Sequence, residues 1–176
     1  DESLKLCELL PNETDIKTCA NGVFMEQFIV IDHSGHIRED TVKDTDISVC
    51  ALQKKTYQPT CLQYAPTSYL EKNSNDYQGA FRYCTNNDDL LVVYCASGVG
   101  SQAMKDQIAA PEQVAIICEL AEKDNYVAAC ISGASSLYVY QHASSQKAYE
   151  LCKNELKAYR TICEGSVWAA SNDLDI

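Results

Sequence analysis

With 176 residues, 46% of them apolar, the chain is long enough and hydrophobic enough for one buried domain or a short array of repeats. Its 25 acidic side chains outnumber 14 lysines and arginines, which gives a net charge of −11. No basic cluster interrupts this acidity, so the surface would repel a nucleic-acid backbone or an anionic membrane. We therefore expect no nucleic-acid partner, and no apolar run is long enough for a membrane span.

The ten cysteines are an even and unusually high number, typical of compartments in which disulfides persist. Zinc ligands usually come in close pairs, whereas no two cysteines here are closer than eleven positions. The chain begins at Asp1 without a Met or an apolar signal core, as a mature secreted product does. Asn12-Glu13-Thr14 is an acceptor pattern for N-glycosylation. Together these features predict a secreted, extracellular protein glycosylated at Asn12.

The cysteines repeat along the chain. They form five successive pairs with internal spacings of 12, 11, 11, 12 and 11 residues, and the first members of pairs two to five are 34 residues apart. A constant step of this size is typical of a solenoid or repeat array. We expect one helical-repeat domain over residues 1–176, with copies at about 1–44, 45–78, 79–112, 113–146 and 147–176.

Each copy is predicted to fold as two helices joined by a short turn. An apolar segment leads into the first cysteine, most clearly Ala148–Leu151 before Cys152. Residues that favour turns or helix N-termini lie between the two cysteines of most pairs. They occur at 10–13, 58–59, 86–89 and 123–125. Helix A should therefore carry the first cysteine of a copy, and helix B should begin just before the second.

A short segment of small residues follows the second cysteine in most copies. It reads Cys19-Ala-Asn-Gly22 in copy one, and copy two breaks the pattern with Cys61-Leu-Gln-Tyr64. The other copies contribute Gly98, Gly133 and, in a shortened form of the segment, Gly165. Because glycine has no side chain, we expect these positions to let neighbouring helices approach closely.

Two disulfide patterns are compatible with these spacings. In the first, the turn brings each pair together, giving five local bridges. In the second, both cysteines of a pair lie on one continuous helix, where eleven residues turn about 1100° and return to nearly the same face. Each helix would then be joined to a neighbour by two bonds, as in twin-cysteine hairpins. The breaker clusters within the pairs favour local bridges. These are Cys7–Cys19, Cys50–Cys61, Cys84–Cys95, Cys118–Cys130 and Cys152–Cys163.

Copy one departs from the regular step, because Cys50 follows Cys7 by 43 residues. The additional residues lie around 28–40 and include His33 and His36, close to Asp32, Glu39 and Asp40. A metal site is conceivable there. However, the spacing matches no strong motif, and Gly35 and the acids that follow it do not fit a calcium loop. A solvated loop is the favoured interpretation, and we expect no cofactor and no bound metal.

Tyrosine is frequent, with 11 residues against three phenylalanines and one tryptophan. Tyr83 and Tyr94 flank cysteines, and Tyr138 and Tyr140 lie on a predicted B helix. Packing between hairpins is the favoured interpretation, because the positions next to cysteines recur with the repeat. The alternative is a tyrosine-lined concave surface that recognises protein or sugar.

The sequence gives little support for catalysis. Ser101 and Ser136 follow Gly98 and Gly133 at equivalent places in two copies, so they belong to the repeat rather than to a nucleophile elbow. His142 stands alone after a tyrosine-rich segment, and all ten cysteines are used by the pairs. We therefore expect a protein that is not an enzyme.

A helix-turn-helix unit of 34 residues resembles the tetratricopeptide-like arrays, and more closely their secreted, cysteine-rich relatives. This resemblance covers nearly the whole chain and implies an all-α, solenoid-like array of five disulfide-stapled αα-hairpins. It also implies a binding scaffold that presents a rigid surface to a protein partner. The alternative is a structural subunit whose copies stack head to tail into an extracellular filament. A metal-dependent enzyme that uses His33 and His36 is the third hypothesis.

Overall fold

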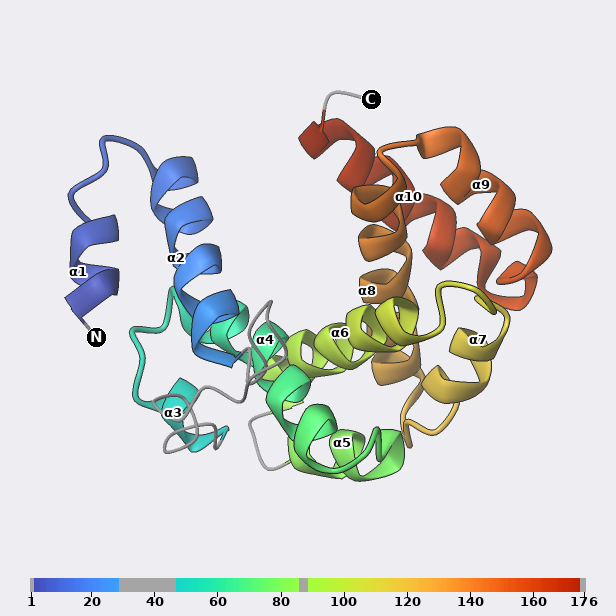
Figure 1. The fold of residues 1–176 in the computed structure, drawn as a ribbon, viewed down its shortest axis with the longest axis horizontal. Coiled ribbons are helices and arrows are strands. Elements are labelled where there is room, and N and C mark those ends of the chain that lie inside the picture. The colour runs from blue at the N-terminus through green and yellow to red at the C-terminus, as the bar shows by residue number, and fades with distance from the viewer. Residues whose placement is uncertain (1, 29–46, 86–88, 175–176) are drawn as a thin grey trace.

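The computed structural model describes residues 2–28, 47–85 and 89–174, and every regular element in these ranges is helical. This confirms the all-α fold class (Figure 1). In chain order the elements are α1 (Glu2–Cys7), α2 (Glu13–Phe28), α3 (Ser48–Ala51), α4 (Gln58–Lys72), α5 (Tyr77–Cys84), α6 (Asp89–Asp106), α7 (Gln113–Cys118), α8 (Asp124–His142), α9 (Ser145–Asn154), a 3-10 turn (Lys157–Tyr159) and α10 (Arg160–Leu174).

The helices come in five pairs, each made of a short helix followed by a long one. The short helices α1, α5 and α7 end at the first cysteine of their pair. Each long helix begins three to six residues before the second cysteine, so helix B starts somewhat earlier than expected in most pairs. The boundaries proposed between copies remain predictions, and the one at 44/45 lies outside the described residues.

Most of the predicted turn residues precede the long helix in the first pair, whereas Asp124 and Asn125 already lie in the first turn of α8. Before α2, the side-chain oxygen of Asn12 accepts a hydrogen bond from the backbone N–H of Asp15 at 2.9 Å, as an N-cap does. Pro59, by contrast, lies within the first turn of α4 instead of between the helices. A backbone N–H has no partner in the first helical turn, so proline is tolerated there. The cluster expected at 86–88 lies outside the described residues.

All ten cysteines form disulfides within their own helix pair. The bridges are Cys7–Cys19, Cys50–Cys61, Cys84–Cys95, Cys118–Cys130 and Cys152–Cys163, with Cα–Cα distances of 5.5–5.6 Å. This is the local pattern, and no helix is joined to a neighbouring pair by two bonds. Each bridge fastens a short helix against its long partner.

The long helices pack on one another in the order α2, α4, α6, α8 and α10, and α6 with α8 makes the most extensive contact. Short helices α5, α7 and α9 also contact the long helix of the preceding pair. The result is an open arc with α1 and α2 at one end and α9 and α10 at the other (Figure 1).

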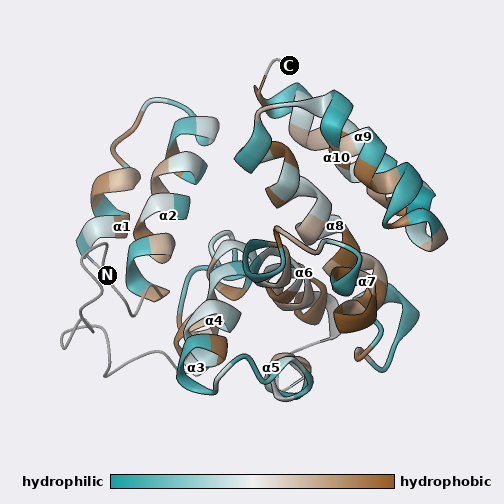
Figure 2. Cartoon of the chain, turned by 45° about the vertical axis from the view of Figure 1, so that its right-hand side comes forward, coloured by the Kyte–Doolittle hydropathy of each residue, from teal (hydrophilic) through white to brown (hydrophobic). Residues whose placement is uncertain are grey.

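Apolar residues are densest on α6, α7 and α8 (Figure 2). Among the described helices, none is sufficiently long and apolar to cross a bilayer.

Two of the expected glycines bring the long helices into backbone contact. A Cβ atom added to Gly98 of α6 would overlap the carbonyl oxygen of Gln63 on α4. One added to Gly133 of α8 would overlap the carbonyl oxygen of Ser97 on α6. Here the helices approach closely because no side chain separates them.

The other two glycines do not serve this purpose. Around Gly22 and Gly165, no described atom lies within 4 Å of an added Cβ. In the last pair, the contact position is held by Ser166, whose hydroxyl donates to Ser132 Oγ at 2.8 Å. The contacting residue of copy five thus comes one position after the predicted glycine, because the contacting face depends on the distance from the cysteine and not on the glycine itself.

This difference predicts opposite effects of one substitution. Gly133→Ala forces a methyl group into backbone, and overpacking of this kind costs about 1–3 kcal/mol of unfolding free energy. Gly22→Ala adds a methyl group in open space and removes a helix-weakening glycine, so it should stabilise by up to about 1 kcal/mol. Denaturant unfolding of both variants without reductant measures the difference. Equal effects of the two substitutions would contradict the proposed backbone contact.

Removing one bridge tests how much the local disulfides contribute. The double variant Cys118→Ala/Cys130→Ala opens a short loop and should lower the unfolding free energy by about 2–4 kcal/mol. Peptide mapping of the native protein without reduction should recover only cross-links within pairs. A cross-link between α5 or α6 and another pair would rule out the local pattern.

Candidate functional site

A groove of about 300 Å³ runs across four consecutive long helices. Its floor is formed by α6, and α4 and α8 form its two sides, with α2 at one end. We refer to it as the long-helix groove. Its lining residues are Met25, Gln63, Tyr64, Thr67, Gly98, Ser101, Gln102, Lys105, Ser136, Leu137 and Tyr140.

Two tyrosines form the opposite sides of the long-helix groove. Tyr64 comes from α4 and Tyr140 from α8, and both line the groove. Between them α6 presents Gly98 and Ser101, which are too small to fill the space. The tyrosines supply large apolar faces with polar ends, a combination enriched at binding surfaces.

Tyr64 occupies the position where α6 and α8 carry glycine, three residues after the second cysteine. Gly98 and Gly133 allow backbone contact with the preceding helix. A tyrosine at this place cannot do so, and α2 contacts α4 less extensively than α4 contacts α6. The break in the repeat at copy two therefore accounts for the side chain that forms one side of the groove.

The polar groups of the groove are held in place by neighbours. Ser101 Oγ donates to the backbone carbonyl of Gly133 at 3.1 Å, which links α6 to α8. Gln102, almost fully buried, donates through Nε2 to Asp106 Oδ1 at 2.9 Å. Asp106 also accepts a hydrogen bond from the Tyr77 hydroxyl at 2.7 Å. These bonds fix the floor, so a ligand would meet a largely preformed surface.

Electrostatically the groove differs from the rest of this acidic chain. Among its lining residues Lys105 carries the single formal charge, and no carboxylate is present. At the rim, the Tyr140 hydroxyl donates to Asp173 Oδ2 at 3.4 Å. Burial raises the pKa of Tyr64. Burial, followed by the charge and hydrogen bond of Asp173, raises the pKa of Tyr140. Both phenols are therefore neutral hydrogen-bonding groups at physiological pH.

A second, wider depression lies between α9 and α10. Two contacts within one helix cross its lining: Arg160 Nε is 2.6 Å from Glu164 Oε1, and Gln146 Nε2 donates to Glu150 Oε1 at 3.5 Å. It is built by a single helix pair, whereas the long-helix groove joins four. For these reasons the long-helix groove is the stronger candidate.

The predicted tyrosines divide between the two interpretations. Tyr83 packs on Tyr69 with ring centroids 4.9 Å apart, and Tyr138 packs on His142 at 4.3 Å. Tyr140 lies in the groove and is 48% exposed, while Tyr94 is 42% exposed and does not line the groove. Of the four predicted tyrosines, Tyr83 and Tyr138 pack on neighbouring rings. Tyr140 belongs to a tyrosine-lined surface that also includes Tyr64.

Asn12 is exposed, but both ends of its side-chain amide take part in the N-cap of α2, with Nδ2 donating to Asp15 Oδ2 at 2.7 Å. Its glycosylation remains a prediction. The histidines and acids of the copy-one insertion, His33 and His36 among them, lie outside the described residues. Within the described part of the chain, no three metal-ligating side chains are grouped closely enough to hold an ion.

Sequence reasoning missed most of the groove. Thr67, Ser101 and Ser136 all stand six residues after the second cysteine of their copy, and Lys105 and Tyr140 stand ten after it. This shared distance from the cysteine is the signal in the sequence that could have indicated the groove residues. It marks the two serines as equivalent, but only the packing of α4, α6 and α8 shows that these positions face a common space.

The chain matches no protein-family model, and no curated protein or solved structure shows significant similarity to it.

The rim contact predicts a measurable titration. Asp173→Asn removes the negative charge next to Tyr140, so the pKa of that phenol should fall toward its ordinary value while that of Tyr64 changes little. Since a raised tyrosine pKa favours the folded, protonated form, stability should decline once the pH rises above about 10. NMR titration of labelled tyrosine rings measures both pKa values. An unchanged Tyr140 pKa would contradict the contact.

Proposed function

We propose that this chain is a non-catalytic secreted protein whose disulfide-stapled helical repeats present a rigid surface to a protein partner. The long-helix groove is the observation that carries the proposal. It is formed by side chains from four helix pairs, and it combines two tyrosine faces with hydroxyl and amide groups on a fixed floor.

The shape and chemistry of the groove favour an extended segment of a partner protein. An apolar side chain fits over Gly98 and Ser101 between the tyrosines, and backbone amides can pair with the serine, threonine and glutamine groups along the sides. Lys105 would favour a carboxylate at its end of the groove. Local disulfides limit the internal freedom of each helix pair, so little ordering cost is expected on binding.

Secretion is supported by the five disulfides, which are typical of extracellular proteins. The arrangement of long helices, each packed on the next, supports a solenoid-like repeat. Binding along such a surface is the usual role of repeat arrays, and here that step is an analogy.

Selection from a displayed random-peptide library tests the proposal even though the partner is unidentified. Peptides that bind the oxidised protein are measured by calorimetry against three variants. Tyr64→Ala and Tyr140→Ala should each weaken binding by about tenfold or more. Tyr94→Ala is the matched control, because it removes a tyrosine of similar exposure outside the groove and should leave affinity unchanged.

Several outcomes would count against this function. Selected peptides whose affinity is unaffected by Tyr64→Ala and Tyr140→Ala bind elsewhere. Equal losses in all three variants would indicate nonspecific contact with tyrosine. Binding of glycans, measured in parallel on an array, with no peptide selected would assign the groove to sugars instead of proteins.

A further inference from the structure

The long helices contact each other in one recurring register. Counting from the second cysteine of each pair, position +3 of one long helix meets position +2 of the helix before it. Gly98 meets Gln63, and Gly133 meets Ser97. Ser166 bonds to Ser132 in the same register. Three consecutive crossings, from α4 to α10, therefore share a single geometry.

The register gives each long helix a forward face and a backward face. Position +5 belongs to the forward face, because a Cβ on Gly100 would overlap the carbonyl oxygen of Cys130 on the next helix. The residues at +5 in the first four pairs are all buried. They are Phe24, Pro66, Gly100 and Ser135.

On α10 no helix of the described residues packs against the forward face. Trp168 occupies position +5 and is 65% exposed, although its four counterparts are buried. Gly165 stands at +2, where no described atom lies within 4 Å of an added Cβ. Asn172, at +9, is also exposed. A large exposed aromatic side chain thus occupies a position that is buried in all four preceding pairs.

On α2 the backward face likewise has no described helix packed against it. Gly22 holds position +3, the place of Gly98 and Gly133, but no described atom approaches it. The neighbouring Cys19 and Val23 are only half-buried, whereas their counterparts in the later pairs are fully buried.

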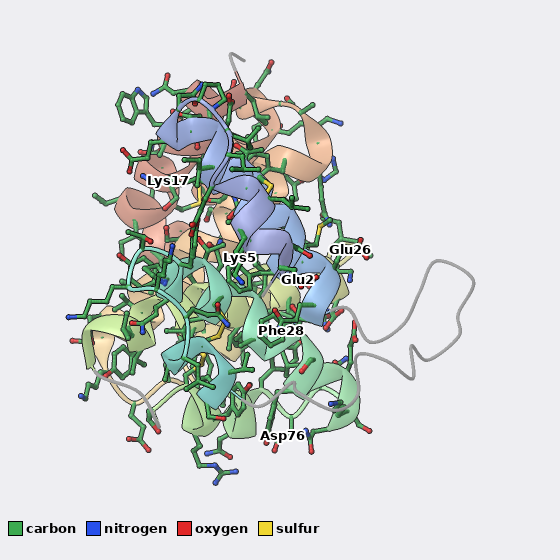
Figure 3. The ribbon with its side chains drawn as sticks, turned by 90° about the vertical axis from the view of Figure 1, so that its left-hand side faces the viewer. Glu2, Lys5, Lys17, Glu26, Phe28 and Asp76 are labelled. Carbon is green, nitrogen blue, oxygen red and sulfur yellow. A yellow bond between two sulfur atoms is a disulfide. The ribbon has the colours of Figure 1, made fainter. Side chains whose placement is uncertain are left out.

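The short helices also differ at the two ends. Tyr83, the residue before the first cysteine of its pair, packs on Tyr69 of the preceding α4. Its counterpart in α1, Leu6, is 68% exposed. Figure 3 looks onto this end of the molecule, where α1 lies in front and Glu2, Lys5 and Glu26 are among its charged residues.

We infer that a second copy of this chain docks here, with α10 of one molecule packed on α2 of the next in the register of the internal crossings. The Gly165 carbonyl lies against Gly22. Trp168, at the position that Pro66 and Ser135 hold in two of the internal crossings, covers the half-buried surface around Cys19 and Val23. The contact joins two different faces, so it is heterologous and extends into a chain of molecules unless it closes into a ring. It does not depend on the long-helix groove or on what binds there.

Sedimentation velocity and light scattering test this on the oxidised protein from about 1 µM to about 1 mM, a range that covers dissociation constants of the same size. The mass should rise with concentration above the 19.5 kDa of a single chain. With a net charge of −11, repulsion between copies is strong. The rise should therefore be larger in 1 M salt, where the screening length is about 3 Å.

Two variants block one face each. Gly22→Gln places a long, uncharged side chain where the carbonyl of the second copy must approach, and Trp168→Ser removes the aromatic side chain from the other face. Each alone should remain monomeric. Mixed in equal amounts they should form a dimer and stop, because each supplies the face that the other lacks. Leu52→Ser, the matched control, removes an 85% exposed leucine outside both faces and should associate as the unchanged protein does.

Each contrary result overturns the inference. A chain that stays monomeric over the whole range, at both salt concentrations, has no such contact. If Gly22→Gln still associates and Trp168→Ser does not, the tryptophan faces pair with each other. If Leu52→Ser is as impaired as Trp168→Ser, the association is nonspecific. Circular dichroism and melting temperature, expected to be unchanged, show whether the variants are folded.

Discussion

The backbone contact between successive long helices is the constraint on which the rest of the structure depends. At Gly98 and Gly133 the distance between helices is set by main-chain atoms, so no change of rotamer can relieve an added methyl group. Ser101 adds a hydrogen bond from α6 to the Gly133 carbonyl in the same contact. Because α6 is pressed between α4 and α8, its small residues become the floor of a groove whose sides belong to its neighbours. Gly98 therefore both allows backbone contact with α4 and leaves space for the groove.

Tyr64 shows how one departure from the register changes both packing and surface. A tyrosine in the glycine position separates α4 from α2, and its ring is then placed opposite Tyr140. Tyr64 is half-buried, and this burial raises the pKa of its phenol. The large side chain thus weakens one crossing and supplies a contact surface. Features that break a local rule without serving the core are the ones expected at functional sites.

The helices and the local disulfides could be predicted from the cysteine repeat together with the turn-forming residues inside the pairs. The close contacts at Gly98 and Gly133 could be predicted from the small residues that follow the second cysteine. These are properties of neighbours along the chain, with a period that the sequence repeats. The groove could not be predicted in this way, because Tyr64, Ser101 and Tyr140 come from three pairs and meet only through the rotation of one helix on the next. Gly165 shows the same limit. At about 100° per residue, the one-position shift from Ser166 turns it away from α8, so matching by residue type selected the wrong residue.

The first helix pair is attached less firmly than the others. Its long helix meets Tyr64 instead of a glycine, and part of its link to the second pair is polar: Glu8 Oε1 lies 2.5 Å from Lys54 Nζ and 3.3 Å from the Tyr57 hydroxyl. The hydrogen bond from Lys54 lowers the pKa of Glu8, so this link is present above the ordinary carboxyl range and is lost as the pH falls through the lowered value. An exposed ion pair contributes little to the free energy of unfolding.

In an array, each unit is stabilised mainly by its neighbours, so a helix pair with one weakly packed neighbour gains the most stability from a second neighbour. The open face of α2, with Gly22 at its centre, is where that second neighbour would bind.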